Sequence, residues 1–219
     1  MHLHTTITTK NNNGFINNKF TTSERPDETF IVKSPADFKD VLGEVQATYT
    51  HIDDAVDSAF QAFPKWRDLK KEKRFEYLNR LSEIFLSKKA LLAETISRET
   101  GKPLWEATGE ASALVAKIKV TLEHSMKLVE DQKIPGALPG GVDGWIRFRP
   151  KGVMAVVGPF NFPAHLPNGH IIPALATGNT VVFKPSDKTP FTGQVMAECF
   201  EEAGFPDGVF NLVQGQVET

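Results

Sequence analysis

The sequence has 219 residues, of which 40% are hydrophobic and 24% are charged. This composition is ordinary for a globular protein, and the length allows a hydrophobic core, so a wholly disordered chain is excluded. Lys and Arg number 25 and Asp and Glu number 27, which gives a net charge of -2. A protein that binds nucleic acid is normally far more basic, so we expect no nucleic acid partner.

The single cysteine excludes an intramolecular disulfide framework and a cysteine-based metal cluster. The longest apolar runs, such as residues 153–157, are far too short to cross a bilayer, so we expect no membrane partner. Residues 1–14 read as a low-complexity polar tail, with the pattern of neither a secretory signal nor a transit peptide. We therefore expect a reduced, cytoplasmic protein.

The charge and the turn-forming residues divide the chain at about residue 150. Residues 151–219 contain only three of the 25 basic residues, but eight of the 16 glycines and seven of the 14 prolines. Apolar segments separated by Gly and Pro favour parallel strands that are buried on both faces. The first 150 residues carry most of the charge and favour helices.

The first 150 residues predict a helical region over 15–133, which begins with a hairpin. Residues 15–20 have Asn-Asn at their centre, which is typical of a tight hairpin turn. Thr50 and Asp53 resemble a capping box at the start of the first helix. Apolar residues at helical spacing predict four helices, which contain residues 52–63, 75–85, 91–96 and 107–126.

The second part of the chain predicts a parallel sheet. A loop is expected over 134–144, and residues 145–149 alternate like a strand with one solvated face. The elements then expected are strands over 153–157, 180–183 and 209–213 and helices over 163–176 and 190–203. This β-α-β-α-β order implies an α/β fold with a right-handed parallel sheet. We expect the strand ending at Val213 to form an open edge.

Two polar clusters follow consecutive strands of this sheet, Gly158–Asn161 and Lys184–Asp187. The carboxyl ends of parallel strands meet at one edge, where ligands of open α/β sheets bind. Asn161 has two interpretations: it caps the next helix, or its amide faces a developing oxyanion. Lys184 is either a solvated side chain or the contact for an anionic or hydroxyl-rich ligand.

The histidines and the cysteine predict no further chemistry. His165 and His170 do not share a helical face, and the sequence has no His-Glu-x-x-His motif, so no metal site is predicted. Cys199 lies on the apolar face of the predicted helix 190–203, and we expect a buried, inert thiol. No Gly-x-Gly-x-x-Gly fingerprint follows the first strand of the sheet.

Several motifs together resemble the aldehyde dehydrogenase superfamily, from about Phe15 to the end of the sequence. In chain order they are Arg98-Glu-Thr-Gly-Lys-Pro103, Trp105-Glu-Ala107, Gly158-Pro-Phe-Asn-Phe-Pro163, Pro173-Ala-Leu-Ala-Thr-Gly-Asn179, Phe183-Lys-Pro-Ser186 and Glu202-Ala-Gly-Phe-Pro206. Within the superfamily, residues 163–170 and 211–215 most resemble the succinylglutamate semialdehyde dehydrogenases of arginine catabolism. The resemblance implies a helical region followed by a partial Rossmann-like sheet.

The resemblance also implies oxidation of an aldehyde by NAD(P). In the family a cysteine thiolate adds to the aldehyde, and a glutamate activates the water that hydrolyses the thioester. By resemblance Asn161 is the amide of the oxyanion hole. His165 either faces the substrate channel or has a packing or capping role.

The cofactor residues follow from the same resemblance. Lys184, with Ser186 beside it, is expected to bind the adenosine ribose, and Pro159 and Phe160 to line the cofactor groove. Members that prefer NAD usually have Glu three residues after the lysine. Asp187 stands there, one methylene shorter, and we expect NAD as the cofactor.

The sequence up to Thr219 does not include the family's general-base glutamate or nucleophilic cysteine. We therefore expect the N-terminal portion of an NAD-dependent enzyme that oxidises a semialdehyde, without its catalytic domain. The expected organisation is a tail over 1–14, the helical part over 15–133, a loop and subunit-contact strand over 134–150, and half of the cofactor sheet over 151–219. Homo-oligomers are expected. The alternative is a non-catalytic module that binds a nucleotide or a partner chain.

Overall fold

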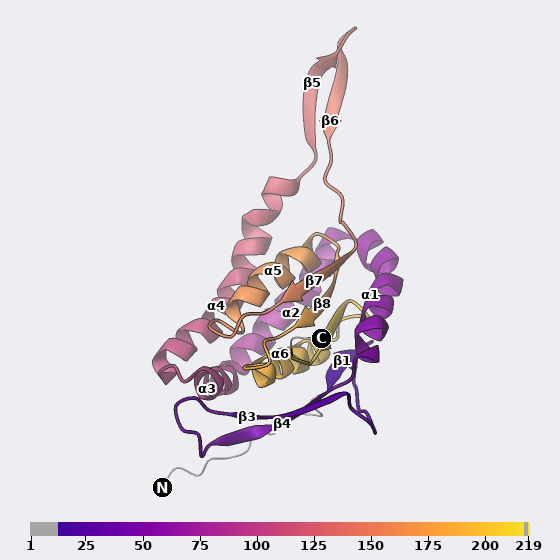
Figure 1. Cartoon of the computed structure of the whole chain (residues 1–219). Coiled ribbons are helices and arrows are strands. Elements are labelled where there is room, and N and C mark those ends of the chain that lie inside the picture. The colour runs from indigo at the N-terminus through magenta and orange to yellow at the C-terminus, as the bar shows by residue number, and fades with distance from the viewer. Residues whose placement is uncertain (1–12, 217–218) are drawn as a thin grey trace.

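The computed structural model describes residues 13–216 and 219, and it has a mixed α/β fold, as predicted (Figure 1). Most of the predicted polar tail, residues 1–12, lies outside the described residues. Asn13 is buried and Gly14 begins a strand, so these two residues do not belong to a tail. The central sheet has five strands in the order β2-β1-β9-β8-β7.

The predicted β-α-β-α-β order is confirmed. Its elements are β7 (Val153–Val157), α5 (His165–Ala176), β8 (Thr180–Lys184), α6 (Pro190–Glu202) and β9 (Phe210–Val213). The three strands are parallel, with Val157 opposite Lys184 and Phe183 opposite Leu212. Strand β8 is almost fully buried because helices cover both of its faces.

The hairpin at the N-terminus completes the other side of the sheet. Strands β1 (Gly14–Ile16) and β2 (Lys19–Phe20) are joined by Asn17 and Asn18, which have φ angles of 52° and 60°. This is the left-handed geometry of a tight hairpin turn, which confirms the predicted hairpin. Strand β1 pairs antiparallel with β9, and the Asn17 N–H donates to Asn211 Oδ1 at 3.0 Å.

This pairing shows that the predicted open edge was wrong. The strand ending at Val213 is covered by β1, so the edge strands of this sheet are β2 and β7, and Val157 of β7 is 76% exposed. The strand that covers β9 comes from nearly 200 residues earlier in the chain. The order of strands along the sequence does not predict a partner so far away.

The four predicted helices are present. They are α1 (Thr50–Asp68), α2 (Lys71–Ser87), α3 (Lys89–Thr100) and α4 (Leu104–Glu123), and a short 3-10 helix, η1 (Ser125–Val129), follows. Trp66, Leu78, Phe85 and Leu114 contribute their apolar side chains to one core with the sheet. The predicted capping box was wrong: Thr50 lies inside the first turn of α1, and no side chain caps this helix.

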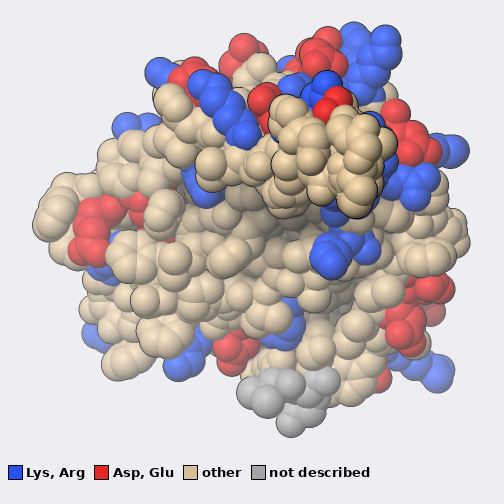
Figure 2. Space-filling model, turned by 90° about the horizontal axis from the view of Figure 1, so that it is seen from above, with Lys and Arg blue, Asp and Glu red and all other residues tan. Residues whose placement is uncertain are grey.

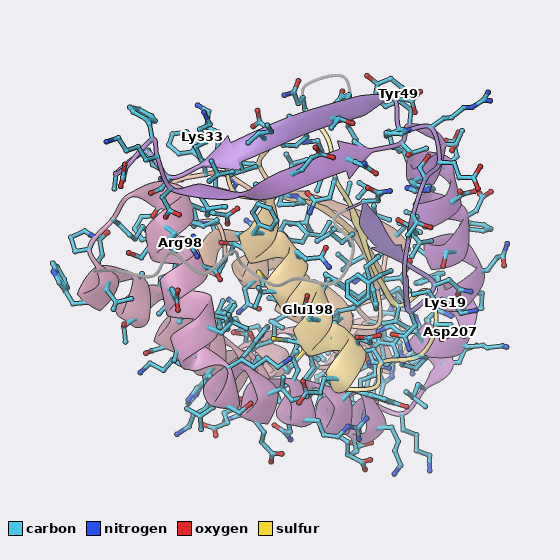
Figure 3. The ribbon with its side chains drawn as sticks, turned by 90° about the horizontal axis from the view of Figure 1, so that it is seen from below. Lys19, Lys33, Tyr49, Arg98, Glu198 and Asp207 are labelled. Carbon is cyan, nitrogen blue, oxygen red and sulfur yellow. The ribbon has the colours of Figure 1, made fainter. Side chains whose placement is uncertain are left out.

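Two hairpins were not predicted as such. Residues 28–47, which were included in the helical region, form the antiparallel strands β3 (Glu28–Lys33) and β4 (Val41–Ala47). Figure 3 shows this ribbon beside α6 and α3. Val32, Leu42 and Val45 form a small core with Phe191 of α6. Two hydrogen bonds from Arg98 to Asp40, of 3.0 and 2.7 Å, attach the ribbon to α3.

The second hairpin replaces the loop predicted over 134–144. Strand β5 (Gln132–Leu138) pairs with β6 (Val142–Ile146), so the strand predicted over 145–149 starts and ends three residues earlier. The hairpin projects from the body of the molecule (Figure 1). Its exposed apolar side chains are Ile134, Leu138, Val142, Trp145 and Ile146.

A buried carboxyl group holds the start of α6. Glu99 of α3 accepts hydrogen bonds from the N–H of Phe191 at 2.7 Å, the N–H of Thr192 at 2.7 Å and the hydroxyl of Thr192 at 2.6 Å. Burial raises the pKa of Glu99 to about 8, although these three hydrogen bonds oppose the rise. A helix start that has no cap of its own is therefore satisfied from a neighbouring helix.

Glu99 should make the stability of the protein fall as the pH rises from about 4.5 to about 8. In this range the folded protein keeps a proton that the carboxyl of the unfolded chain, with a pKa near 4.5, has released. The free energy of unfolding should therefore decrease, by at most about 1.4 kcal/mol per pH unit from this group. Urea unfolding of the wild type and of Glu99→Gln across this pH range measures the decrease in the free energy of unfolding. Glu99→Gln should have the flatter pH dependence, and parallel curves would contradict the assignment.

Candidate functional site

The carboxyl ends of β7 and β8 lie side by side and bring together the two predicted polar clusters. Val157 is opposite Lys184, and the N–H of Gly158 donates to the Lys184 carbonyl at 2.8 Å. A Cβ at Gly158 would lie 2.9 Å from the Phe183 ring and 3.2 Å from Pro167. The first cluster therefore starts at a position where only glycine lets the chain pass between β8 and α5.

The side chain of Asn161 is exposed and forms no hydrogen bond with the described residues. Helix α5 begins at His165, its N-cap is Ala164, and no side chain of the N-cap bonds to the first turn. The interpretation of Asn161 as the cap of this helix is therefore wrong. Its carboxamide is available to a ligand at the carboxyl ends of the strands.

Two residues that the sequence analysis did not assign hold the turn that contains Asn161. Oε1 of Glu110 accepts hydrogen bonds from the N–H groups of Ala164 at 3.0 Å and His165 at 3.1 Å. Nζ of Lys102 donates to Oε2 of Glu110 at 2.8 Å and to the carbonyl of Asn161 at 2.9 Å. Lys102 belongs to a motif that carried the family resemblance, but neither residue shows from its sequence position what it contacts.

Lys184 is half-buried at the end of β8, and its ammonium group already has protein partners. Nζ donates to the carbonyl of Gly215 at 2.7 Å and to that of Pro185 at 3.4 Å. Burial lowers the pKa of Lys184, while the charges of Asp187 and Glu28 oppose this change. An ammonium group has three N–H donors, so one remains for a ligand hydroxyl.

The other predicted cofactor residues lie in the two turns that follow β7 and β8. Ser186 donates from Oγ to Asp187 Oδ1 at 3.1 Å and accepts a hydrogen bond from the Lys188 N–H at 3.2 Å. The Phe160 ring is 53% exposed and lies 4.7 Å from Lys188 Nζ, and Pro159 is half-buried before it. The two turns are thus in contact through the Phe160 ring and the Lys188 ammonium group.

Cys199 is buried in α6, as predicted. Burial is the main cause that raises the pKa of its thiol to about 12; the charge of Lys88 opposes this rise, and the charges of Glu198 and Glu202 add to it. The nucleophilic form of cysteine is the thiolate. Cys199 therefore has neither the access nor the ionisation that a nucleophile needs.

His165 lies at the start of α5 behind Asn161. Its ring is edge-on to Phe162, with 6.5 Å between the ring centroids, and its Nδ1 is buried without a hydrogen-bond partner among the described residues. Residues 13–216 and 219 contain no group of three or more His, Cys, Asp or Glu side chains that could hold a metal ion. None of the helices in this part of the chain has the length and apolarity required to span a membrane.

The charges at the end of the molecule that carries the β5–β6 hairpin are mixed. Figure 2 shows Lys and Arg interspersed with Asp and Glu around a largely uncharged centre. This face therefore has no continuous field of one sign.

The comparisons with known proteins identify the family of the chain. Residues 20–219 match the aldehyde dehydrogenase family. An N-succinylglutamate 5-semialdehyde dehydrogenase of Caulobacter vibrioides is 47% identical over 188 residues, which cover 84% of this chain and 38% of that protein. The chain thus spans well under half the length of this curated relative.

Solved structures share the fold over nearly the whole chain. The crystal structure of an NADP-dependent enzyme of Escherichia coli has a TM-score of 0.87 and 34% identity, and the match covers 94% of this chain and 42% of that one. For the NADP-dependent glyceraldehyde-3-phosphate dehydrogenase of Bacillus halodurans, solved with NADP, the TM-score is 0.88 at 28% identity. That match covers 96% of this chain and 44% of the other.

Proposed function

Because this chain belongs to the aldehyde dehydrogenase family, we propose that it forms the part of an NAD-dependent aldehyde dehydrogenase that contains the oxyanion amide and the adenosine-ribose contact. The proposed substrate is N-succinylglutamate 5-semialdehyde, the substrate in the name of relatives that are 43–47% identical. The observation that carries the proposal is the exposed, unbonded carboxamide of Asn161 at the carboxyl end of β7, one strand from Lys184.

Asn161 would act on charge that is absent from the substrate. When a thiolate adds to the aldehyde carbon, the carbonyl oxygen becomes an oxyanion, and an amide N–H fixed near it is stabilising mainly in the transition state. Since Cys199 is buried with a pKa of about 12, the thiolate would come from a cysteine outside these residues. We therefore propose that the 219 residues alone do not oxidise aldehydes.

The residues present fit the ribose end of a nicotinamide dinucleotide. One N–H of Lys184 remains for a hydroxyl, and the exposed Phe160 ring offers an apolar surface beside Lys188, in the turn that follows Lys184. NAD, when bound, supplies the acceptor for the hydride. The carboxylate of Asp187 supports NAD over NADP because it would repel a phosphate on the 2′-oxygen. The enzyme is proposed to be cytoplasmic.

Lys184→Ala should weaken NAD binding to the 219-residue chain about ten-fold or more, since it removes a hydrogen bond from a charged donor. Titration calorimetry measures this change. Lys119→Ala removes an exposed lysine of α4 and serves as the control, with affinity unchanged. Equal affinity of Lys184→Ala and wild type would place the cofactor elsewhere. NADP should bind more weakly than NAD, and equal binding would contradict the cofactor assignment.

In the whole enzyme, Asn161→Ala should lower kcat by about 10²–10³ with little change in KM, because one donor to the oxyanion is lost. Asn161→Asp should be at least as damaging, since a carboxylate repels the oxyanion. Steady-state kinetics with N-succinylglutamate 5-semialdehyde measure both variants. A kcat near wild type in Asn161→Asp would refute the role of this residue.

The β5–β6 hairpin supports a proposed homo-oligomer, because its apolar side chains project into solvent. Trp145→Ser should shift the protein toward smaller species in light scattering, since it removes one of the largest of these side chains. Val120→Ser removes an exposed apolar side chain of α4 and should leave the mass unchanged. A monomeric wild type, or equal masses of Trp145→Ser and wild type, would contradict the assignment of the hairpin.

A further inference from the structure

We propose that Lys102 and Glu110 are positioning residues that fix the main chain of the 161–165 turn and thereby aim the Asn161 carboxamide. This inference rests on the proposed function of Asn161. The two side chains make three hydrogen bonds to the main chain of this turn, at Asn161, Ala164 and His165, with distances of 2.9 to 3.1 Å. The side chain of Asn161 itself is left free of hydrogen bonds with the described residues.

The contacts restrict the turn on both sides of the Asn161 side chain. Lys102 Nζ holds the carbonyl of Asn161 and lies 4.3 Å from the centre of the Phe162 ring. Glu110 holds the N–H groups three and four residues further on. With the backbone fixed, the position of the carboxamide depends only on the two side-chain torsions of Asn161. A donor held in this way needs little reorganisation when the oxyanion forms.

The two charged groups hold one another in place. The side chain of Lys102 is 10% exposed and that of Glu110 is 1% exposed, so each charge needs a close partner. The carboxylate also lies at the start of α5, where the N-terminal end of the helix dipole favours a negative charge. Removing either partner would leave the other buried and uncompensated.

The backbone of Lys102 is fixed as well. Gly101 ends α3 in the left-handed region, with φ 75°, and directs the chain toward α4. Ser97 Oγ donates to the Lys102 carbonyl at 2.7 Å, and Thr100 Oγ1 accepts from its N–H at 3.3 Å. The ammonium group therefore extends toward the turn from a rigid base.

A role limited to stabilising α5 does not explain the contact with Asn161. The bonds from Ala164 and His165 to Glu110 satisfy donors at the helix start, which is a sufficient structural role for that carboxylate. The Asn161 carbonyl lies outside the helix, three residues before its N-cap. The contact of Lys102 with this carbonyl acts on the turn alone, whereas its ion pair with Glu110 also supports the start of α5. The coupling of Lys102 to Asn161 is therefore what distinguishes positioning from stability.

The decisive experiment is a double-mutant cycle in the whole enzyme with Lys102→Met and Asn161→Ala. If Lys102 acts through Asn161, Lys102→Met should lower kcat about ten-fold to a hundred-fold with KM and the Kd for NAD unchanged. The same change should cost almost nothing in the Asn161→Ala background. An equal factor in both backgrounds, or an unchanged kcat in the single variant, would overturn the inference.

The cycle also separates this inference from the proposed function. A wild-type kcat in Asn161→Ala would contradict the proposed function. If Asn161→Ala lowers kcat as expected but Lys102→Met does not, only the positioning role is contradicted. Arg80→Met is the matched control. Arg80 donates to the Ala203 carbonyl at 3.0 Å, at the far end of α6, and its replacement should leave kcat unchanged.

A second readout does not depend on activity. In the 219-residue chain, NMR relaxation should give Asn161 and Phe162 backbone order parameters of about 0.85 in wild type. These should fall below about 0.6 in Lys102→Met. Glu110→Gln keeps an oxygen for the helix N–H groups and should loosen the same residues to a smaller extent. Wild-type order in both variants would contradict the inference even where neither changes the stability.

Discussion

Two buried glutamates hold the starts of the helices that follow β7 and β8, and the arrangement of the turns at these strand ends depends on them. The first turn of any helix has N–H groups without partners inside the helix. Ala164, the N-cap of α5, has no acceptor in its side chain, and Thr189 does not cap α6. Glu110 and Glu99 supply these acceptors from α4 and α3. The helical region therefore determines where each helix begins, and with it the shape of the turn in front.

The opposite ends of the same helices are held by donors from the N-terminal helices. Trp66 Nε1 donates to the carbonyl of Leu175, and Arg74 Nε to that of Ala176, both at 3.1 Å. Arg80 contacts the end of α6 in the same way. The Glu110 carboxylate at the start of α5 and the guanidinium groups of Arg74 and Arg80 at the ends of α5 and α6 complement the helix dipoles. The N-terminal helices thus set the orientation of α5 and α6 along the sheet, which explains why the two parts share one hydrophobic core.

The sequence predicted well what depends on local pattern. Short apolar runs with Gly and Pro between them located β7, β8 and β9, and the Asn17-Asn18 turn located the first hairpin. The polar turns at the strand ends followed from the topology. The features that were missed depend on distant partners or on weak periodicity. Glu110 contacts residues more than 50 positions away, and β1 joins β9 across the whole chain. The residues of β3 and β4 are mixed in polarity, and their buried face is defined only by the packing on Phe191 of α6.

The site combines a rigid main chain with side-chain groups that are left unsatisfied. Lys184 makes two hydrogen bonds to carbonyls and keeps one N–H, while Asn161 has its carbonyl held and its whole carboxamide free of the described residues. Stability alone would favour a turn whose polar side chains bond to their own backbone, as Ser186 does with the Lys188 N–H. A rigid backbone with a free donor is the arrangement that stabilises a charge formed only during a reaction. The geometry thus gives a physical reason for the role proposed for Asn161 that the resemblance alone could not supply.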